Sequence, residues 1–353
     1  MVGINYLSAP VFVWWDVTYA CNLRCRQCYS GSGKPHPNEL DTKEAKSLIR
    51  ELAEMKVFYI YFLGGEPLMR KDIFELAEYA REHGIATMMS TNGWFVTSEV
   101  ASRLEKVGFM HLRVSLDGAT AKTHDSIRGM KGSFNRAIRA IQLLKETSIP
   151  RIGISPTVLS ENVDEMSALI KLGLELKVDE MQLVQLCARG RGAQAQPASI
   201  DQLIKLRDVF TEYKSKLAGV LNLTATEGIS LEESLDTKNN SSLPDFWGCP
   251  AGRTCLSIEA EGTIQPCILY KTSAGNVRER SITEIWEESL LFKKMRTPDE
   301  ECLDCRYVRV CSGECPIDSC VDYFFRRRFT ECLQRKGGET YADRKENSND
   351  RPK

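Results

Sequence analysis

The sequence predicts an α/β fold with a mainly parallel sheet, followed by a smaller cysteine-rich region. The first 190 residues alternate between short apolar, β-rich runs and longer segments with apolar residues at helical spacing. Six such strand–helix rounds favour a parallel sheet, either doubly wound or rolled into a partial barrel. Beyond Trp247 the composition changes, and nine of the 13 cysteines occur there. That change predicts a separate unit.

The strands are expected at the apolar runs and the helices between them. The expected strands are residues 12–17, 58–63, 86–90, 111–116, 151–158 and 181–186. The expected helices are residues 41–56, 72–83, 98–107, 133–147, 163–176 and 200–217. The first helix has a marked start, because Asp41 and Glu44 match a capping box. Its apolar face is expected to comprise Ala45, Leu48, Ile49 and Leu52.

Four segments are expected along the chain. They are a barrel-like α/β unit at residues 1–195, a helical linker at 196–245, a cysteine-rich domain at 246–335 and a disordered tail at 336–353. The linker is expected to end in residues 235–245, which are polar and rich in turn-forming residues. The tail has almost no apolar residues, so it cannot bury enough surface to fold.

The charge balance excludes two classes of partner. With 47 basic and 48 acidic residues the net charge is −1, so neither nucleic acid nor an anionic membrane is expected as a partner. No apolar run approaches the roughly 20 residues that cross a bilayer. Residues 1–10 also lack the charged-then-apolar order of a signal peptide. We therefore expect a cytoplasmic protein whose cysteines bind metal rather than pair as disulfides.

The first cysteine group has the spacing of an iron–sulfur loop. Cys21, Cys25 and Cys28 are separated by three and two residues, so one loop can wrap a single cluster. Three ligands leave one iron of a four-iron cluster open to a small chelating substrate. A structural zinc site would need a fourth ligand, and His36 is the only candidate nearby. Iron–sulfur ligation is therefore favoured over zinc binding or simple burial of the thiols.

This motif, Cys-x3-Cys-x2-Cys after a first strand, resembles the signature of the radical SAM superfamily. The resemblance implies a partial (β/α)6 TIM barrel and a catalytic [4Fe–4S] cluster on Cys21, Cys25 and Cys28. It also implies S-adenosylmethionine (SAM) as cofactor, cleaved reductively to a 5′-deoxyadenosyl radical that abstracts a hydrogen from the substrate. Gln27 departs from the family, which often has an aromatic residue there, and we expect this difference to affect adenine packing.

Further candidate SAM contacts lie at the ends of the predicted strands, where barrel enzymes keep their sites. Gly64-Gly65-Glu66-Pro67 ends the second strand, and its glycines let a ligand approach the backbone closely. Glu66 can pair with an ammonium group, and the resemblance implies that this segment holds the amino group of the methionine moiety. The other candidates are Asn92, Ser115, Asp117 and Arg128. Ser115 resembles a ribose or carboxylate contact and Arg128 a carboxylate partner, with capping and turn roles as the alternative for Asn92, Asp117 and Arg128.

The second cysteine group resembles the SPASM extension of radical SAM maturases. A hairpin is expected at residues 256–265, with its turn at Gly262. The resemblance implies two auxiliary [4Fe–4S] clusters, so that the protein would hold three in all. Auxiliary cluster I would take Cys249, Cys255, Cys267 and Cys315. Auxiliary cluster II would take Cys302, Cys305, Cys311 and Cys332. Cys320 is the alternative to Cys332, zinc is the alternative occupant of the second group, and Cys187 is expected to be a buried apolar residue.

Within the SPASM group the sequence resembles maturases of the mycofactocin type, and the stretches that carry this resemblance are residues 19–33, 57–66, 90–93, 190–192 and 248–254. This implies an oxidoreductase that crosslinks or decarboxylates a ribosomally made peptide, with auxiliary clusters that accept an electron. An external one-electron donor, ferredoxin or flavodoxin, is implied. A separate leader-peptide-binding protein is also implied, because the chain lacks the N-terminal winged-helix domain of some peptide maturases.

Three other functions are alternatives to peptide maturation. Maturation of a tetrapyrrole or another cofactor would use the same chemistry. A sulfatase maturase is disfavoured, because the family has Asp after the cysteine that Cys267 matches, and Ile268 stands here. A non-catalytic iron–sulfur electron carrier does not explain a motif of only three cysteines.

Overall fold

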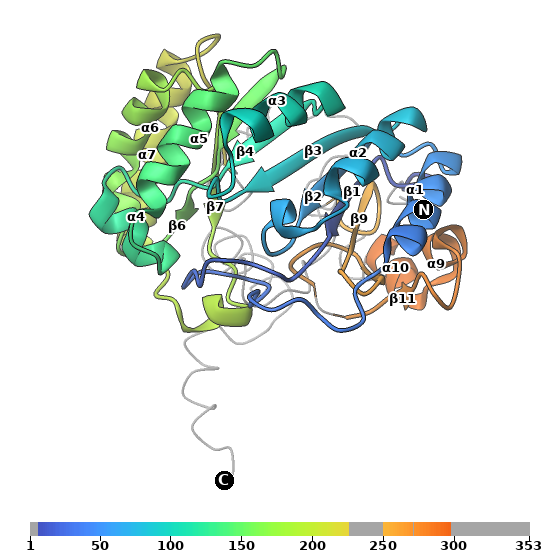
Figure 1. Cartoon of the computed structure of the whole chain (residues 1–353). Helices are drawn as coiled ribbons and strands as arrows, with labels where there is room; N and C mark the ends of the chain where they lie inside the picture. Colours follow the sequence, from blue (N-terminus) through green and yellow to red (C-terminus); the bar gives the residue numbers. More distant parts are fainter. Residues whose placement is uncertain (1–5, 226–249, 271, 298–353) are drawn as a thin grey trace, which may run out of the picture.

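The structure of the chain, a computed structural model, describes residues 6–225, 250–270 and 272–297. These residues form an eleven-stranded mixed sheet with helices packed against it (Figure 1). The strand order is β11-β10-β9-β1-β2-β3-β4-β5-β7-β6, and β8 pairs with β7. The pairs β9–β10 and β10–β11 are antiparallel, whereas the other pairs are parallel.

The elements have the following bounds. The strands are β1 (Phe12–Asp16), β2 (Tyr59–Leu63), β3 (Ala86–Thr91), β4 (His111–Val114), β5 (Arg151–Ile154), β6 (Thr157–Val158), β7 (Glu180–Gln185), β8 (Asn222–Ala225), β9 (Cys255–Ile258), β10 (Thr263–Gln265) and β11 (Gly275–Asn276). The α-helices are α1 (Thr42–Glu54), α2 (Ile73–Glu82), α3 (Ser98–Val107), α4 (Ala121–Arg128), α5 (Ser133–Lys145), α6 (Met166–Glu175), α7 (Ile200–Lys216), α9 (Ile282–Glu288) and α10 (Leu290–Arg296). The short 3₁₀ helices are η1 (Pro67–Met69), η2 (Val163–Glu165) and η3 (Gly190–Gln194).

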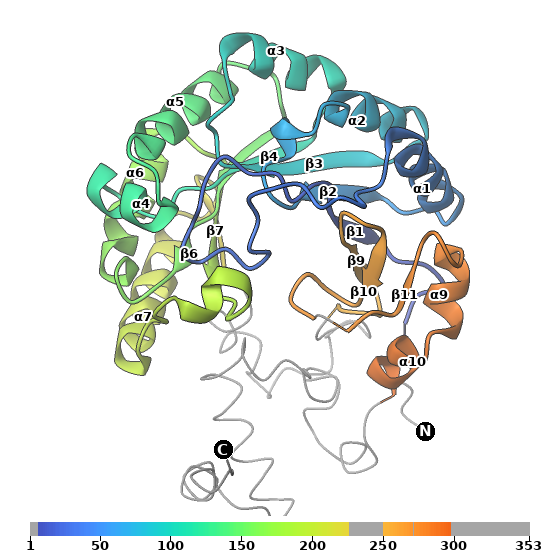
Figure 2. The same cartoon turned by 60° about the horizontal axis from the view of Figure 1, so that its bottom comes forward.

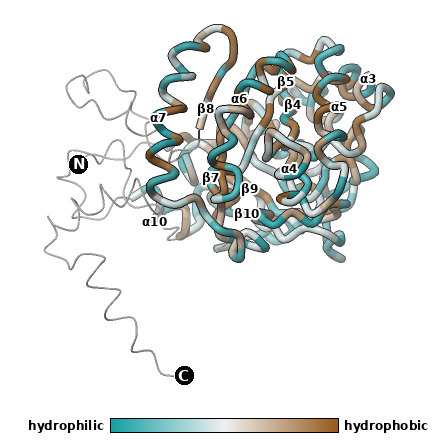
Figure 3. The backbone as a smooth tube through the Cα atoms, turned by 90° about the vertical axis from the view of Figure 1, so that its left-hand side faces the viewer, coloured by the Kyte–Doolittle hydropathy of each residue, from teal (hydrophilic) through white to brown (hydrophobic). Residues whose placement is uncertain are grey.

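The sheet is curved, and its helices lie outside the curve. In Figure 2, α1, α2, α3, α5 and α7 form an arc around the strands, and the loop between β1 and α1 lies on the inner side. Along α7, hydrophilic and hydrophobic residues alternate (Figure 3), as expected for a helix with one face on a sheet. The predicted partial barrel is confirmed. Within the described ranges, no helix is both long and apolar enough to cross a membrane.

The first helix forms for the reasons that its sequence suggested. The Glu44 N–H donates to Asp41 Oδ1 at 2.8 Å, and the Asp41 N–H donates to Glu44 Oε2 at 2.9 Å, so both halves of the capping box are present. The four expected apolar residues are buried against the sheet. A cap of this kind stabilises a helix by about 1 kcal/mol.

Two expected elements differ in the structure. The strand expected at residues 151–158 is split into β5 and β6 at Ser155 and Pro156, because proline has no N–H to donate to a neighbouring strand. Residues 121–128, expected only as a motif after the fourth strand, form α4, which begins at the Thr120 cap and ends at Gly129 with φ +67°.

The segment expected as a helical linker adds to the sheet where it is described. Helix α7 is followed by β8, which pairs in parallel with β7 from Asn222 to Ala225. Residues 226–245 of that segment and the expected tail at 336–353 lie outside the described residues.

The cysteine-rich region continues the same sheet. The hairpin forms as expected, with β9 and β10 joined by a turn in which Gly262 has φ +88°. The sequence did not indicate that β9 would pair in parallel with β1, from Phe12 opposite Cys255 to Trp15 opposite Ile258. Trp286 and Phe292 are fully buried in the same apolar core as Trp15. The two expected domains therefore share a sheet and a core.

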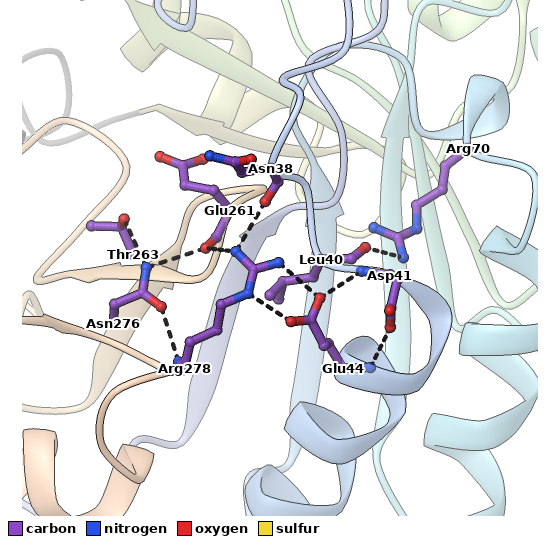
Figure 4. A network of polar contacts seen from close by, with 9 residues as sticks. All are labelled: Asn38, Leu40, Asp41, Glu44, Arg70, Glu261, Thr263, Asn276 and Arg278. Carbon is purple, nitrogen blue, oxygen red and sulfur yellow. Dashed lines mark hydrogen bonds and ion pairs between the residues drawn. The ribbon is translucent and has the colours of Figure 1, made fainter.

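A polar network also joins the hairpin region to α1 (Figure 4). Arg278 forms a bidentate ion pair with Glu44, with Nε–Oε1 and Nη2–Oε2 distances of 2.6 and 2.8 Å. It also donates to the carbonyls of Asn38 and Glu261, at 3.0 and 3.2 Å. Because Glu44 is also the capping-box residue, one carboxylate fixes the start of α1 and the position of the cysteine-rich region.

Candidate active site

The three cysteines of the first group lie on the loop that follows β1, on the inner side of the curved sheet (Figure 2). Backbone hydrogen bonds join this loop to the end of β2: Gly65 N–H donates to Thr18 O at 2.7 Å, and Glu66 N–H donates to Ala20 O at 2.8 Å. On its other side, Arg26 N–H donates to Ile127 O at 2.9 Å, next to the end of α4. The loop is thus fixed by the ends of two elements distant in sequence.

Glycines allow this close contact. A Cβ at Gly65 would lie 2.2 Å from Ala20 O, and one at Gly190 would lie 2.7 Å from Cys28 O. A Cβ at Gly129 would lie 2.8 Å from Arg24 O. Such distances are too short for any side chain, so neighbouring backbones hold the cysteine loop from three sides. Gly64 is equally constrained, with φ +115° and a Cβ position 2.4 Å from Thr18 O.

The thiols are in an environment that disfavours free thiolates. Cys25 is buried, and Cys21 and Cys28 are half-buried. Burial raises the pKa of the Cys21 thiol to about 11. It also raises the pKa of Cys25, against the opposing effect of the Arg128 guanidinium, whose Nη1 lies 3.7 Å from Cys25 Sγ. A cation bound at these positions would therefore stabilise the thiolates.

The donor set fits an iron–sulfur cluster. Within the described ranges, no three His, Cys, Asp or Glu side chains converge on a site for a single ion. Cluster ligation differs from this, because each cysteine binds its own iron. The Cys25 and Cys28 thiols contribute to the raised pKa of Cys21, so the three side chains lie near one another. Cys21, Cys25 and Cys28 can hold a four-iron cluster and leave one iron open.

Glu66 is fully buried where β2 and β3 end side by side. Its Oε1 accepts hydrogen bonds from Thr91 Oγ1 at 2.7 Å and from Leu68 N–H at 3.2 Å, and its Oε2 accepts one from Asn92 N–H at 2.7 Å. Burial raises the pKa of this carboxyl to about 7, although these hydrogen bonds oppose the shift. A carboxylate offers about four acceptor positions, so one remains for a further donor. Pro67 begins η1 and is buried beside it.

Asp117 lies at the centre of a second buried group. Its Oδ2 is 2.6 Å from Arg128 Nε and accepts a hydrogen bond from Gln27 Nε2 at 2.5 Å, while its Oδ1 accepts one from Thr157 N–H at 2.8 Å. Burial raises the pKa of Asp117, and Arg128 opposes that shift. Because Asp117 is fully buried, it positions Arg128 and Gln27 beside the cysteine loop. Gln27 is thus a polar link between the loop and this carboxylate.

Asn92 and Ser115 differ in how they are held. Asn92 Nδ2 donates to Asn22 Oδ1 at 2.9 Å and lies 4.0 Å from Cys21 Sγ, so Asn92 belongs to the cysteine loop's surroundings. The Ser115 side chain is half-buried, and its hydroxyl has no hydrogen-bond partner within the described residues. Ser115 is therefore available to a ligand.

Arg191, which we did not expect as a site residue, fastens the cysteine loop from the far side. Its Nε donates to Cys25 O at 2.8 Å, and its Nη1 donates to Gly31 O and Ser32 O, both at 2.9 Å. The signal available in the sequence was the tripeptide Gly190-Arg191-Gly192 after a strand. Asn162 was also missed: its Nδ2 donates to Asp117 O at 2.7 Å, across 45 positions, and no local pattern indicates it.

The described part of the second cysteine group lies on the hairpin. Cys255 begins β9 and Cys267 follows β10, and both are buried. The six described cysteines form no disulfide with one another, and Cys187 is buried after β7. The remaining expected auxiliary ligands lie outside the described residues. They are Cys249, Cys302, Cys305, Cys311, Cys315 and Cys332.

Comparison with known proteins agrees with this geometry. Residues 15–173 match the family described as the radical SAM superfamily, and residues 249–316 match SPASM, an iron–sulfur cluster-binding domain. Over 327 residues the chain is 33% identical to the AdoMet-dependent heme synthase of Methanosarcina barkeri, a match covering 88% of this chain and 92% of that protein. The chain belongs to the radical SAM superfamily and carries a SPASM domain. The expected family and enzyme class are confirmed.

Two further proteins are similar to this chain in sequence or in fold. Mycofactocin maturase MftC of Mycobacterium tuberculosis is 35% identical over 319 residues, covering 88% of this chain and 79% of that protein. The crystal structure of Streptococcus suis SuiB bound to precursor peptide SuiA has the same fold, with a TM-score of 0.76 and 22% identity. That match covers 89% of this chain and 74% of SuiB. Membership in the family implies iron–sulfur clusters and SAM as cofactors.

Proposed function

We propose that this enzyme oxidatively modifies a ribosomally made peptide by radical SAM chemistry. The observation that carries the proposal is the loop of Cys21, Cys25 and Cys28, held by glycine contacts beside two buried carboxylates. The peptide substrate is inferred from the similarity to MftC and to SuiB, whose structure contains a precursor peptide. A leader-peptide-binding protein and a ferredoxin or flavodoxin donor are part of the proposal, as is a cytoplasmic location.

Each residue of the site would have its own role in binding the cluster or SAM. Cys21, Cys25 and Cys28 would hold a [4Fe–4S] cluster, which when bound supplies the electron that cleaves SAM to methionine and a 5′-deoxyadenosyl radical. Arg128 places a positive charge beside Cys25 and would offset the negative charge of the thiolates. The segment from Gly64 to Pro67 would receive the methionine amine, and Asn92 and Ser115 would contact SAM. Asp117 would act through Arg128 and Gln27.

Iron content tests the proposed auxiliary clusters. If Cys249, Cys255, Cys267 and Cys315 hold one cluster and Cys302, Cys305, Cys311 and Cys332 another, the chain should bind about twelve irons in three [4Fe–4S] clusters. The measurement is iron and sulfide analysis after anaerobic reconstitution. A fully loaded protein with about four irons would rule out both auxiliary clusters. Reductive formation of 5′-deoxyadenosine from SAM, assayed on the same sample, tests the proposed chemistry itself.

We expect Glu66→Gln to weaken SAM binding without changing iron content. The amide keeps the shape of the side chain but loses the charge that would pair with the methionine ammonium. A hydrogen bond to a charged group contributes about 1.5–3 kcal/mol, so affinity should fall by roughly ten- to a hundredfold. Equilibrium dialysis of SAM against the reconstituted variant measures this. Equal affinity in the two proteins would mean that backbone groups of Gly64 and Gly65 make the contact alone.

A second candidate function is decarboxylation of a haem precursor or another tetrapyrrole. It is favoured by the 33% identity to the Methanosarcina barkeri heme synthase. The chemistry at the cysteine loop would be the same, so the substrate alone separates the two. Coupled formation of 5′-deoxyadenosine and product with a tetrapyrrole carboxylate, and not with peptides, would support the second candidate.

A further inference from the structure

A polar cavity of about 440 Å³ adjoins the cysteine loop, and nothing described above uses it. One wall is the loop itself, with Tyr29 next to Cys28. The second is Arg189 after β7, and the third is the SPASM hairpin with Ser257 and Glu259. Asp16 at the end of β1 also lines the cavity. Since β1 and β9 run in parallel as neighbours, both carboxylates lie at the end of the sheet where barrel enzymes bind substrates.

Asp16 presents an acceptor that the protein does not use. The side chain is 7% exposed, and Tyr29 Oη donates to its Oδ1 at 2.7 Å. Within the described residues, no other hydrogen bond reaches this carboxylate. The charged and titratable groups around it are Tyr19, Tyr29, Glu259, Glu261 and Arg189. Burying an anion without a full set of partners is costly, and a cationic ligand would offset that cost.

Ser257 provides a second, independent acceptor. It lies two residues before Glu259, so both side chains point to the same face of the hairpin. It is 3% exposed, and its hydroxyl has no hydrogen-bond partner within the described residues. A nearly buried hydroxyl that lines a cavity and lacks a partner indicates a ligand with a hydrogen-bonding group, and this hydroxyl can accept from a donor.

The charges that line the cavity indicate which kind of ligand group fits it. Three carboxylates line the cavity, those of Asp16, Glu259 and Glu261. The half-buried cation on this wall, Arg189, already donates through Nη1 to Ile268 O at 2.6 Å. The other cation, Lys34, is solvent-exposed. Burial raises the pKa of Asp16 to about 7 and, together with Glu261, raises that of Glu259, as expected where anions are crowded.

We propose that this cavity binds an ammonium or guanidinium group of the substrate, with Asp16 and Ser257 as its main contacts. The proposal rests on the proposed function, because lysine, arginine and N-terminal amines are the cations that a peptide carries. The carboxylates of a tetrapyrrole would be repelled by the same three acids. The cavity volume is in the range that binds a single side chain with its flanking backbone.

Two matched probes test the proposal on the reconstituted full-length enzyme. Nα-acetyl-lysine amide and Nα-acetyl-norleucine amide share an unbranched four-carbon side chain, and only the first ends in a charged ammonium group. Anaerobic calorimetry should show the lysine probe binding at least about tenfold more tightly. Equal affinity would overturn the proposal. Tighter binding of Nα-acetyl-glutamate amide would also overturn it and would point to a substrate that carries carboxylates.

Single substitutions test whether Asp16 and Ser257 form the binding site for the lysine probe. Asp16→Asn keeps the acceptor for Tyr29 but removes the charge, and it should lower affinity for the lysine probe by roughly ten- to a hundredfold. Ser257→Ala should lower it severalfold. Glu78→Gln, an exposed carboxylate on α2, is the matched control and should leave it unchanged. Full affinity in both Asp16→Asn and Ser257→Ala would overturn the proposal.

The same samples distinguish a failure of the cationic subsite from a failure of the proposed radical SAM function. SAM cleavage without preference for lysine would reject the cationic subsite and leave the radical chemistry intact. A reconstituted enzyme that forms no 5′-deoxyadenosine would instead reject the proposed function. Circular dichroism and iron content of each variant show whether its fold and clusters are retained.

Discussion

Replacing Cys21, Cys25 and Cys28 together with alanine is expected to reduce SAM cleavage to the level of the enzyme-free reaction. These are the only cysteines on the loop that Gly65, Gly129 and Gly190 hold in place. Without their thiolates no cluster can form there, and the protein alone has no group that can reduce SAM. The reconstituted variant should lose about four irons and keep about eight.

The measurement is 5′-deoxyadenosine formed under a chemical reductant, together with iron analysis and a denaturation curve. Cys187→Ala is the matched control, since it removes a buried thiol that lies after β7 and outside the cysteine loop, and it should cleave SAM at close to the wild-type rate. If the triple variant still cleaved SAM, a cluster elsewhere in the chain would have to start the reaction.

Gly65→Ala should disrupt the same loop without touching a ligand. The new methyl group would lie 2.2 Å from Ala20 O and 2.9 Å from Tyr19 C, and both are backbone atoms that cannot turn aside. Over-packing usually costs about 1–3 kcal/mol, and a clash with backbone should reach or exceed the upper end of that range. Either β2 or the cysteine loop must move, so iron occupancy of the first cluster should fall with stability.

Gly173→Ala separates this clash from a general effect of the substitution. At that position in α6 the added methyl group would meet Ile154 and Val178 side-chain carbons at an ordinary 3.4 Å. Alanine also favours a helix over glycine by about 1 kcal/mol. Urea unfolding should therefore show a stable control and a destabilised Gly65→Ala protein. Equal stability of the two would mean that the loop can shift at little cost.

Features set by local sequence were predicted, because their causes lie within a few residues. The capping box of Asp41 and Glu44 and the turn at Gly262 are of this kind, and the structure has both. The meeting of Glu66 with Asn92 could also be anticipated, since parallel strands that are neighbours end at the same edge. The roles of individual residues toward SAM stay predictions.

The rest depends on contacts that no local pattern encodes. Gln27 donates a hydrogen bond to Asp117 across 90 positions. Arg191 donates to Gly31 O, which precedes it by 160 positions in the sequence. The pairing of β9 with β1 was hidden for another reason. The apolar alternation of a short strand tells which face is buried but not which strand lies beside it.

That pairing has a consequence for how the chain is made. On the ribosome, β1 emerges long before β9, yet the two strands are neighbours in the finished sheet. Until Cys255 to Ile258 have been synthesised, one edge of β1 has no partner, and an open edge strand promotes association with other chains. Because pairing distant segments is also slow, the nascent protein passes through a long period of exposure. A chaperone that covers this edge would therefore be expected to raise the yield of folded enzyme.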